Sequence, residues 1–192
     1  MTKSRQIEVE FRAQLSETEH ARIKKHLEEQ GKLLSEQDQA SYYFYDSGKA
    51  FKMVHDKDKG SMRIAHKLKT ILQGIDFEEL EIVIDPKDID TAVPMFKSLL
   101  GINRVIYDEQ KRFNYEYKGL EIALKWSEGW GHHIELEKVV SEQADVAKAE
   151  EEIRSVAKEL GVELMTIADI KKLEDKILDK LERGDYKVAG YI

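Results

Sequence analysis

The segment Ile-Glu-Val-Glu-Phe-Arg at residues 7–12 alternates apolar and charged residues without interruption. In a β-strand, successive side chains point to opposite faces, so Ile7, Val9 and Phe11 share one face and Glu8, Glu10 and Arg12 share the other. The segment therefore predicts a strand with one apolar face and one densely charged face.

The same alternation recurs along the chain. Glu-x-Glu occurs at three places, residues 8–10, 79–81 and 135–137, each time interleaved with aliphatic residues. Several cations stand at the corresponding position of other apolar runs: Lys52, Arg63, Lys67, Lys69, Arg112 and Lys125. The pattern predicts one sheet with a shared charged face.

The predicted elements are about eight strands and four helices in an α+β fold. The strands are expected at residues 6–14, 40–45, 50–54, 61–69, 77–85, 105–117, 120–126 and 132–140. The helices are expected after a capping box at Ser16–Glu19 and ending at Gly31, from Pro86 to about Leu100, and over residues 142–160 and 169–181.

Composition limits the function further. The 192 residues fit a single domain, residues 1–192, with C-terminal helices from about residue 142. A net charge of −7 argues against binding to nucleic acid or an anionic membrane, and the absence of cysteine excludes disulfides and thiolate metal sites. The N-terminus has no apolar signal-peptide core and no long apolar run follows, so a cytoplasmic protein is expected.

The charged faces allow two interpretations. They are either the solvated side of an ordinary sheet or the lining of a sheet that curls into a closed barrel with its helices outside. In a closed barrel, crowded carboxylates require cations to neutralise them, and glutamate oxygens suit Mg²⁺ or Mn²⁺. Lysine and arginine in the same space suit phosphate oxygens. A triphosphate bound together with divalent cations fits this set of charges.

With these motifs, the sequence resembles the CYTH superfamily, the triphosphate tunnel metalloenzymes. The family's N-terminal Glu-x-Glu-x-Lys stands here as Glu8-Val-Glu10-Phe-Arg12, and its mid-chain Glu-x-Glu as Glu79-Leu-Glu81. Its later Asp-x-Val-x-Gly-Leu-Gly, followed by Glu-x-Glu, is similar to residues 125–131 and 135–137. The resemblance covers about residues 5–140 and implies a closed eight-stranded antiparallel tunnel with a charged lumen.

The resemblance also implies roles for individual residues. Metal binding, by Mg²⁺ or Mn²⁺, is carried over to Glu8, Glu10, Glu79, Glu81, Glu135 and Glu137. Phosphate binding is carried over to Arg12, Lys52, Arg63, Lys67, Lys69 and Arg112. Catalysis is carried over to Glu8, Glu10 and Arg12. The family's Leu-Arg-Ile-Arg strand is matched in part by residues 51–54 and in part by residues 62–65, so Lys52 and Arg63 are alternatives for one role.

The chain departs from the family pattern at three positions. Arg12 replaces a lysine, Gln110 replaces the first cation of a Lys-x-Arg pair, and Lys125 stands where an aspartate associated with the metal is usual. Lys125 reverses a charge inside the expected tunnel. It either points into the lumen near Glu135 and Glu137, or extends out of the tunnel mouth beside Trp126.

Three functions remain open. The first is a metal-dependent phosphohydrolase acting on tripolyphosphate or an organic triphosphate such as thiamine triphosphate. The second is a class IV-type adenylyl cyclase forming cyclic AMP and pyrophosphate from ATP, and the third is a module that binds a polyphosphate without turnover. The expected partner is a small triphosphate-bearing molecule, and a homodimer through the terminal helix is a further alternative.

Overall fold

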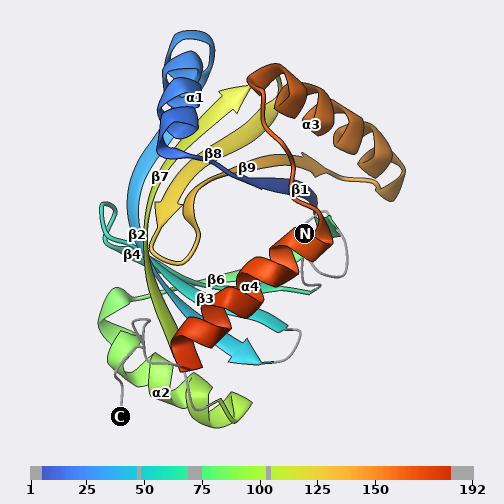
Figure 1. Cartoon of the computed structure of the whole chain (residues 1–192). Coiled ribbons are helices and arrows are strands. Elements are labelled where there is room, and N and C mark those ends of the chain that lie inside the picture. Colours follow the sequence, from blue (N-terminus) through green and yellow to red (C-terminus); the bar gives the residue numbers. More distant parts are fainter. Residues whose placement is uncertain (1–5, 47–48, 69–74, 103–104, 183–192) are drawn as a thin grey trace.

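A single, strongly curled antiparallel β-sheet forms the centre of the molecule, with four α-helices around it (Figure 1). The computed structural model describes residues 6–46, 49–68, 75–102 and 105–182. The strands are β1 (Ile7–Gln14), β2 (Lys32–Asp46), β3 (Lys49–Asp56), β4 (Ser61–Lys67), β5 (Asp76–Phe77), β6 (Glu79–Ile84), β7 (Val105–Tyr117), β8 (Leu120–Ser127) and β9 (Gly131–Val140). The helices are α1 (Glu17–Gln30), α2 (Ile89–Leu100), α3 (Val146–Leu160) and α4 (Ile167–Glu182).

The strand order is β5-β1-β9-β8-β7-β2-β3-β4-β6, and the predicted α+β class is confirmed. The strand predicted at residues 77–85 is divided at Glu78 into β5 and β6, which is why the sheet has nine strands instead of eight. These two pieces are the two ends of the strand order: β5 pairs with β1 and β6 pairs with β4.

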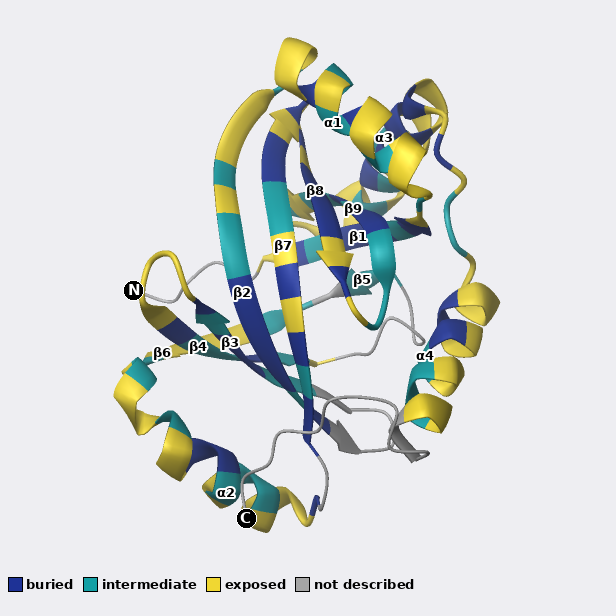
Figure 2. Ribbon diagram, turned by 60° about the vertical axis from the view of Figure 1, so that its left-hand side comes forward, coloured by how far each residue is buried: buried dark blue, intermediate teal, exposed yellow. Residues whose placement is uncertain are grey.

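The apolar residues of the sheet pack against α1 and α3 in one cluster and against α2 in another, so these three helices cover its outer, convex face. Figure 2 shows them outside the curled sheet. Val9 and Phe11 of β1 pack with Ile23 of α1 and Ile153 of α3 in the larger core cluster. A second cluster joins α2, through Ala92 and Val93, to strands β2, β3 and β4. The alternation seen in the sequence therefore places the charged residues on the concave face.

Local sequence signals fix the ends of the first helix. Ser16 Oγ accepts a hydrogen bond from the Glu19 backbone N–H at 3.2 Å, and the Ser16 backbone N–H donates to Glu19 Oε2 at 2.8 Å, so the predicted capping box is confirmed. Gly31 ends α1 where a Cβ atom would lie 2.9 Å from the Leu27 carbonyl oxygen. Only glycine fits this close approach without displacing backbone.

Strand β2 is much longer than the predicted 40–45. It begins at Lys32 and pairs with β7 along nearly its whole length, including Gln37 with Arg112 and Gln39 with Gln110. In the first half of β2, residues 35–39 are polar on both faces of the strand, so the sequence shows no alternation of apolar and polar residues there. The pairing partner, and not the local pattern, extends the strand.

The last helix connects two distant parts of the sheet. Ile170 of α4 packs with Trp130 in the β8–β9 turn, and Ile177 and Leu178 pack with Tyr43 of β2 and Ile106 of β7. Tyr43 and Ile106 belong to the alternate residues of β2 and β7 whose side chains point to the concave face. Helix α4 therefore reaches that face at one end of the sheet (Figure 1). Among the described residues, no helix is long and apolar enough to cross a membrane.

Candidate metal and phosphate site

The concave face brings together the charged residues of β1 and β9. In the register of these strands, Glu10 lies opposite Glu137 and Arg12 lies opposite Glu135. Val9 and Leu136 point to the outer core, which forces their charged neighbours inward. The N-terminal and the last Glu-x-Glu motifs therefore meet, although more than a hundred residues separate them in sequence.

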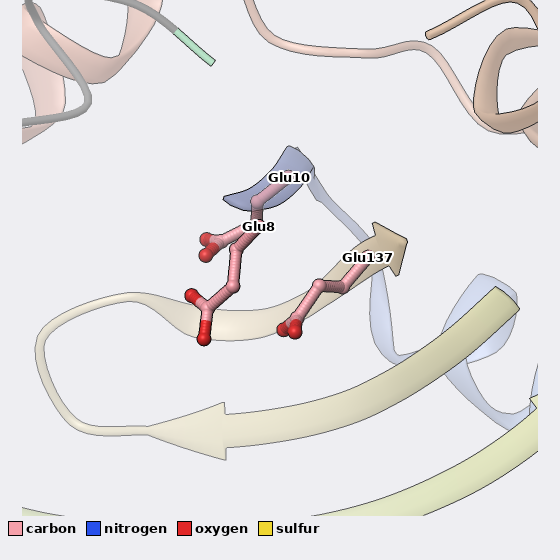
Figure 3. A group of neighbouring side chains, drawn as sticks. All are labelled: Glu8, Glu10 and Glu137. Carbon is pink, nitrogen blue, oxygen red and sulfur yellow. The ribbon is translucent and has the colours of Figure 1, made fainter. Parts of the chain in front are cut away.

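Glu8, Glu10 and Glu137 form an acidic triad (Figure 3). Each of the three can offer one carboxylate oxygen such that these atoms all lie within 4.8 Å of one another. Burial, together with the neighbouring Glu8, Glu10 and Glu135, raises the pKa of Glu137 to about 8. Burial also raises the pKa of Glu8. Without a bound cation, these carboxylates cannot all ionise, because their negative charges repel one another. Their oxygens are the ligands that a hard divalent cation prefers.

Lys67 links β4 to this triad. Its Nζ lies 2.8 Å from Glu10 Oε2, 3.6 Å from Glu8 Oε2 and 3.7 Å from Glu79 Oε2. The pKa of Glu10, whose side chain is 2% exposed, would rise through burial, but Arg12 and Lys67 outweigh burial and hold it below its usual value. The mid-chain motif thus reaches the triad through Glu79, with Lys67 as the common partner.

Arg12 joins two of the carboxylates. Its Nε lies 2.5 Å from Glu10 Oε1 and 3.1 Å from Glu135 Oε1. Its guanidinium carbon lies 5.2 Å from the centre of the Trp130 ring, within the range of a cation–π contact. The sequence does not predict this contact, because a tryptophan in a glycine-rich turn is more often a packing or turn residue than a ligand-binding one.

Lys125 points into the concave face and not out of its mouth. The residue is 6% exposed, and its ammonium forms an ion pair with Glu135 Oε2. Burial lowers the pKa of Lys125 to about 7, while Glu135 opposes this shift. Lys125 and Arg12 together hold the pKa of Glu135 well below its usual value, against the effect of burial.

His133 lies next to this ion pair, as its shared parity with Glu135 predicts. It stands opposite Lys125 in the β8–β9 register and is almost completely buried. Its Nδ1 lies 2.9 Å from the Gly131 carbonyl oxygen. Burial and the neighbouring Lys125 lower the pKa of His133 to about 4, so the ring is neutral at physiological pH.

Lys52 and Arg112 are two of the predicted phosphate ligands. Neither has a carboxylate at ion-pair distance among the described residues. Burial lowers the pKa of Lys52, with Glu79 acting in the opposite direction. Arg112 Nε donates to Asn114 Oδ1 at 2.9 Å and lies opposite Lys125 in the β7–β8 register. These cations remain available to an anion on the concave face.

The remaining predicted residues lie at the edge of the site or outside it. Arg63 Nε and Glu81 Oε1 are 2.8 Å apart, the Glu81 side chain is 49% exposed, and neither residue belongs to the acidic triad. Lys69 lies outside the described residues. Tyr43 also lies on the concave face, which the sequence did not predict. Residues 42–44 are all aromatic, so no alternation shows which of them points inward.

This arrangement places an acidic triad and a group of cations on one face of a curled sheet, and its groups have the chemistry that a divalent cation and a polyanion require. The profile of the CYTH domain matches residues 6–168, so the chain belongs to the CYTH domain family, as its motifs predict. A comparison with curated proteins gives no match.

Solved structures share the fold at low sequence identity. The PH1012 protein of Pyrococcus horikoshii has a TM-score of 0.66 and 23% identity, with 84% of this chain and 98% of that chain covered. A protein of Vibrio parahaemolyticus, described as a proposed adenylate cyclase, has a TM-score of 0.65 and 17% identity, with 88% and 98% covered. A proposed adenylyl cyclase of Hippeastrum, whose description states a dominant triphosphatase activity, has a TM-score of 0.57 and 20% identity, with 83% and 89% covered.

Proposed function

We propose that this protein is a divalent-metal-dependent phosphohydrolase that acts on a small triphosphate, either tripolyphosphate or an organic triphosphate. The observation that carries the proposal is the presence of an acidic triad and of uncompensated cations on one concave face. Membership of the CYTH family supports it, since CYTH proteins are typically triphosphatases or cyclase-like enzymes.

We further propose that the sheet closes into a tunnel around this face. The two ends of the strand order, β5 and β6, are separated only by Glu78, and β5 pairs with β1 through Glu8–Phe77 and Val9–Asp76. A single strand that changes partners at Glu78 would thus join β4 to β1. Closure would exclude water from the charged face and strengthen each ion pair there.

Each charged group has a part in this proposal. Glu8, Glu10 and Glu137 would hold Mg²⁺ or Mn²⁺, with Glu79 and Glu135 next to them; the ion supplies charge neutralisation on the phosphate oxygens. Lys52 and Arg112 bind the phosphate oxygens, and Arg12 offsets the negative charge that develops during transfer. Water attacks the terminal phosphorus, the bridging P–O bond breaks towards diphosphate, and a concave-face carboxylate accepts the proton.

Turnover with separate product analysis tests the proposal. Tripolyphosphate, thiamine triphosphate and ATP are each incubated with Mg²⁺ or Mn²⁺, and phosphate, pyrophosphate and cyclic AMP are quantified independently. Release of phosphate that disappears in Glu10→Gln, but persists in the surface variant Glu128→Gln, is the expected result. No release from any substrate with either metal would contradict the proposal.

Cyclisation of ATP is the second candidate. Its support is the row of buried neutral side chains beside the cations on the concave face, Gln39, Ser41, Gln110 and Asn114, which can hydrogen-bond an organic group. Cyclic AMP and pyrophosphate, in place of phosphate, would favour this candidate in the same assay. Saturable binding of tripolyphosphate without any product would favour a binding module.

A further inference from the structure

Glu135 is neutralised from two sides by groups of the chain itself. Arg12 Nε contacts its Oε1 at 3.1 Å, and Lys125 forms an ion pair with its Oε2. Both oxygens of this carboxylate therefore have a cationic partner, in contrast to the neighbouring acidic triad, where Glu137 has no described cation at ion-pair distance.

The packing leaves Lys125 no alternative direction. Leu124, the preceding residue, is fully buried in the outer core, which turns Lys125 to the concave face. The inward neighbours of Lys125 on its own strand, Ala123 and Ser127, are themselves buried. The lysine stem is thus enclosed and the ammonium cannot extend to solvent as lysines near a surface commonly do.

The two halves of the concave face consequently differ in their balance of carboxylates and cations. Within the part of the chain that the structure describes, the cations at ion-pair distance from Glu8, Glu10 and Glu137 are Lys67 and Arg12, so carboxylates outnumber cations in this half. Around Glu135, by contrast, Lys125 and Arg112 already outnumber the single carboxylate, before Arg12, which both halves share, is counted. A divalent cation is attracted to the first half and repelled from the second.

We propose that Lys125 is a built-in cation that occupies the place of a second divalent ion, so that this protein loads a single divalent cation, at Glu8, Glu10 and Glu137. The Glu135 half then binds phosphate oxygens directly through Lys125, Arg12 and Arg112. The inference rests on the proposed function, and it adds that the metal contacts one end of the phosphate chain while side-chain cations contact the rest.

Titration of Mn²⁺ alone, followed by electron paramagnetic resonance of the free ion, counts the bound ions without any turnover. The wild type, Lys125→Asp and the isosteric Lys125→Met are compared. Lys138→Asp serves as the matched control, because Lys138 forms its ion pair with Glu152 of α3, away from the concave face. Circular dichroism and melting temperature show which variants are folded.

We expect one Mn²⁺ per chain for the wild type and the control, and two for Lys125→Asp. Lys125→Met should also gain a second ion, bound about tenfold more weakly than in Lys125→Asp because it adds no ligand. Two ions in the wild type, or one in every folded Lys125 variant, would overturn the inference and leave the proposed function intact. No bound ion in the wild type would overturn the proposed function as well.

Discussion

Glu137 is the residue whose environment is least favourable to its ionised form. It lies within carboxylate distance of Glu8 and Glu10, and its pKa of about 8 exceeds the usual 4.5. The folded state therefore binds more protons than the unfolded state between these pH values, so this residue's contribution to stability falls as the pH rises from about 4.5 and levels off above about 8.

Glu137→Gln should therefore stabilise the metal-free protein at pH 8, by about 1–3 kcal/mol, because it removes the repulsion without removing volume. The same change should abolish stabilisation by Mn²⁺. Urea unfolding at pH 5 and pH 8, with and without Mn²⁺, measures both effects. Glu128→Gln, in an exposed turn, is the control and should behave as the wild type. Loss of stability at pH 8 would contradict the assignment.

Lys67 illustrates the opposite case, a cation on which buried carboxylates depend. Lys67→Met leaves Glu10 with Arg12 as its one remaining ion-pair partner among the described residues, and should lower the free energy of unfolding by about 2–4 kcal/mol. Lys57→Met, which breaks an exposed pair with Glu109, should cost less than about 0.5 kcal/mol. Equal effects of the two changes in urea unfolding would show that Glu10 is not held by Lys67.

At the scale of elements, the alternation of apolar and charged residues along each strand was the most informative property of the sequence. The alternation at residues 7–12 and 132–137 located β1 and β9 and assigned their charged residues to one face, which the core clusters confirm. It could not show that Lys125 is enclosed, because parity alone does not distinguish a buried lysine from one that reaches solvent. It also missed the first half of β2, whose partner β7 is remote in sequence.

Helix α4 depends on a cap that sequence reasoning overlooked. Thr166 Oγ1 accepts from the Asp169 backbone N–H at 3.2 Å, and Asp169 Oδ2 accepts from the Thr166 backbone N–H at 2.9 Å. Thr166→Ala should destabilise the start of α4 by about 1 kcal/mol and loosen Ile170 from Trp130.

Fluorescence of Trp130 measures this effect in a Trp126→Phe background, since the chain has two tryptophans. Thr166→Ala should shift the emission to longer wavelength as the ring gains water. The matched change at the cap of α1, Ser16→Ala, should lower stability by a similar amount and leave the emission unchanged. An unchanged emission in Thr166→Ala would mean that α4 does not shield Trp130.

At the scale of the whole molecule, ligands should couple to folding. A ligand that binds only the native state at a hundredfold excess over its Kd adds about 2.7 kcal/mol, which corresponds to roughly 5–10 °C in melting temperature for a domain of this size. Tripolyphosphate with Mg²⁺ should give a larger shift than either alone, because the proposed site holds the two ligands side by side on one face. Identical melting curves in all four conditions would contradict both hydrolysis and binding.

The position of β6 at the end of the strand order has a consequence for handling the protein at high concentration. Among the described strands, β6 pairs with β4 only, and its Ile82 and Val83 are 65% and 78% exposed. An apolar strand with a free hydrogen-bonding edge favours edge-to-edge aggregation. Ile82→Lys, on the outer face of β6, should therefore reduce light scattering of concentrated solutions at unchanged melting temperature, whereas an unaltered scattering profile would locate any self-association elsewhere. Colloidal stability and the charged interior would then be properties that can be engineered separately, one from the edge of the sheet and the other from its concave face.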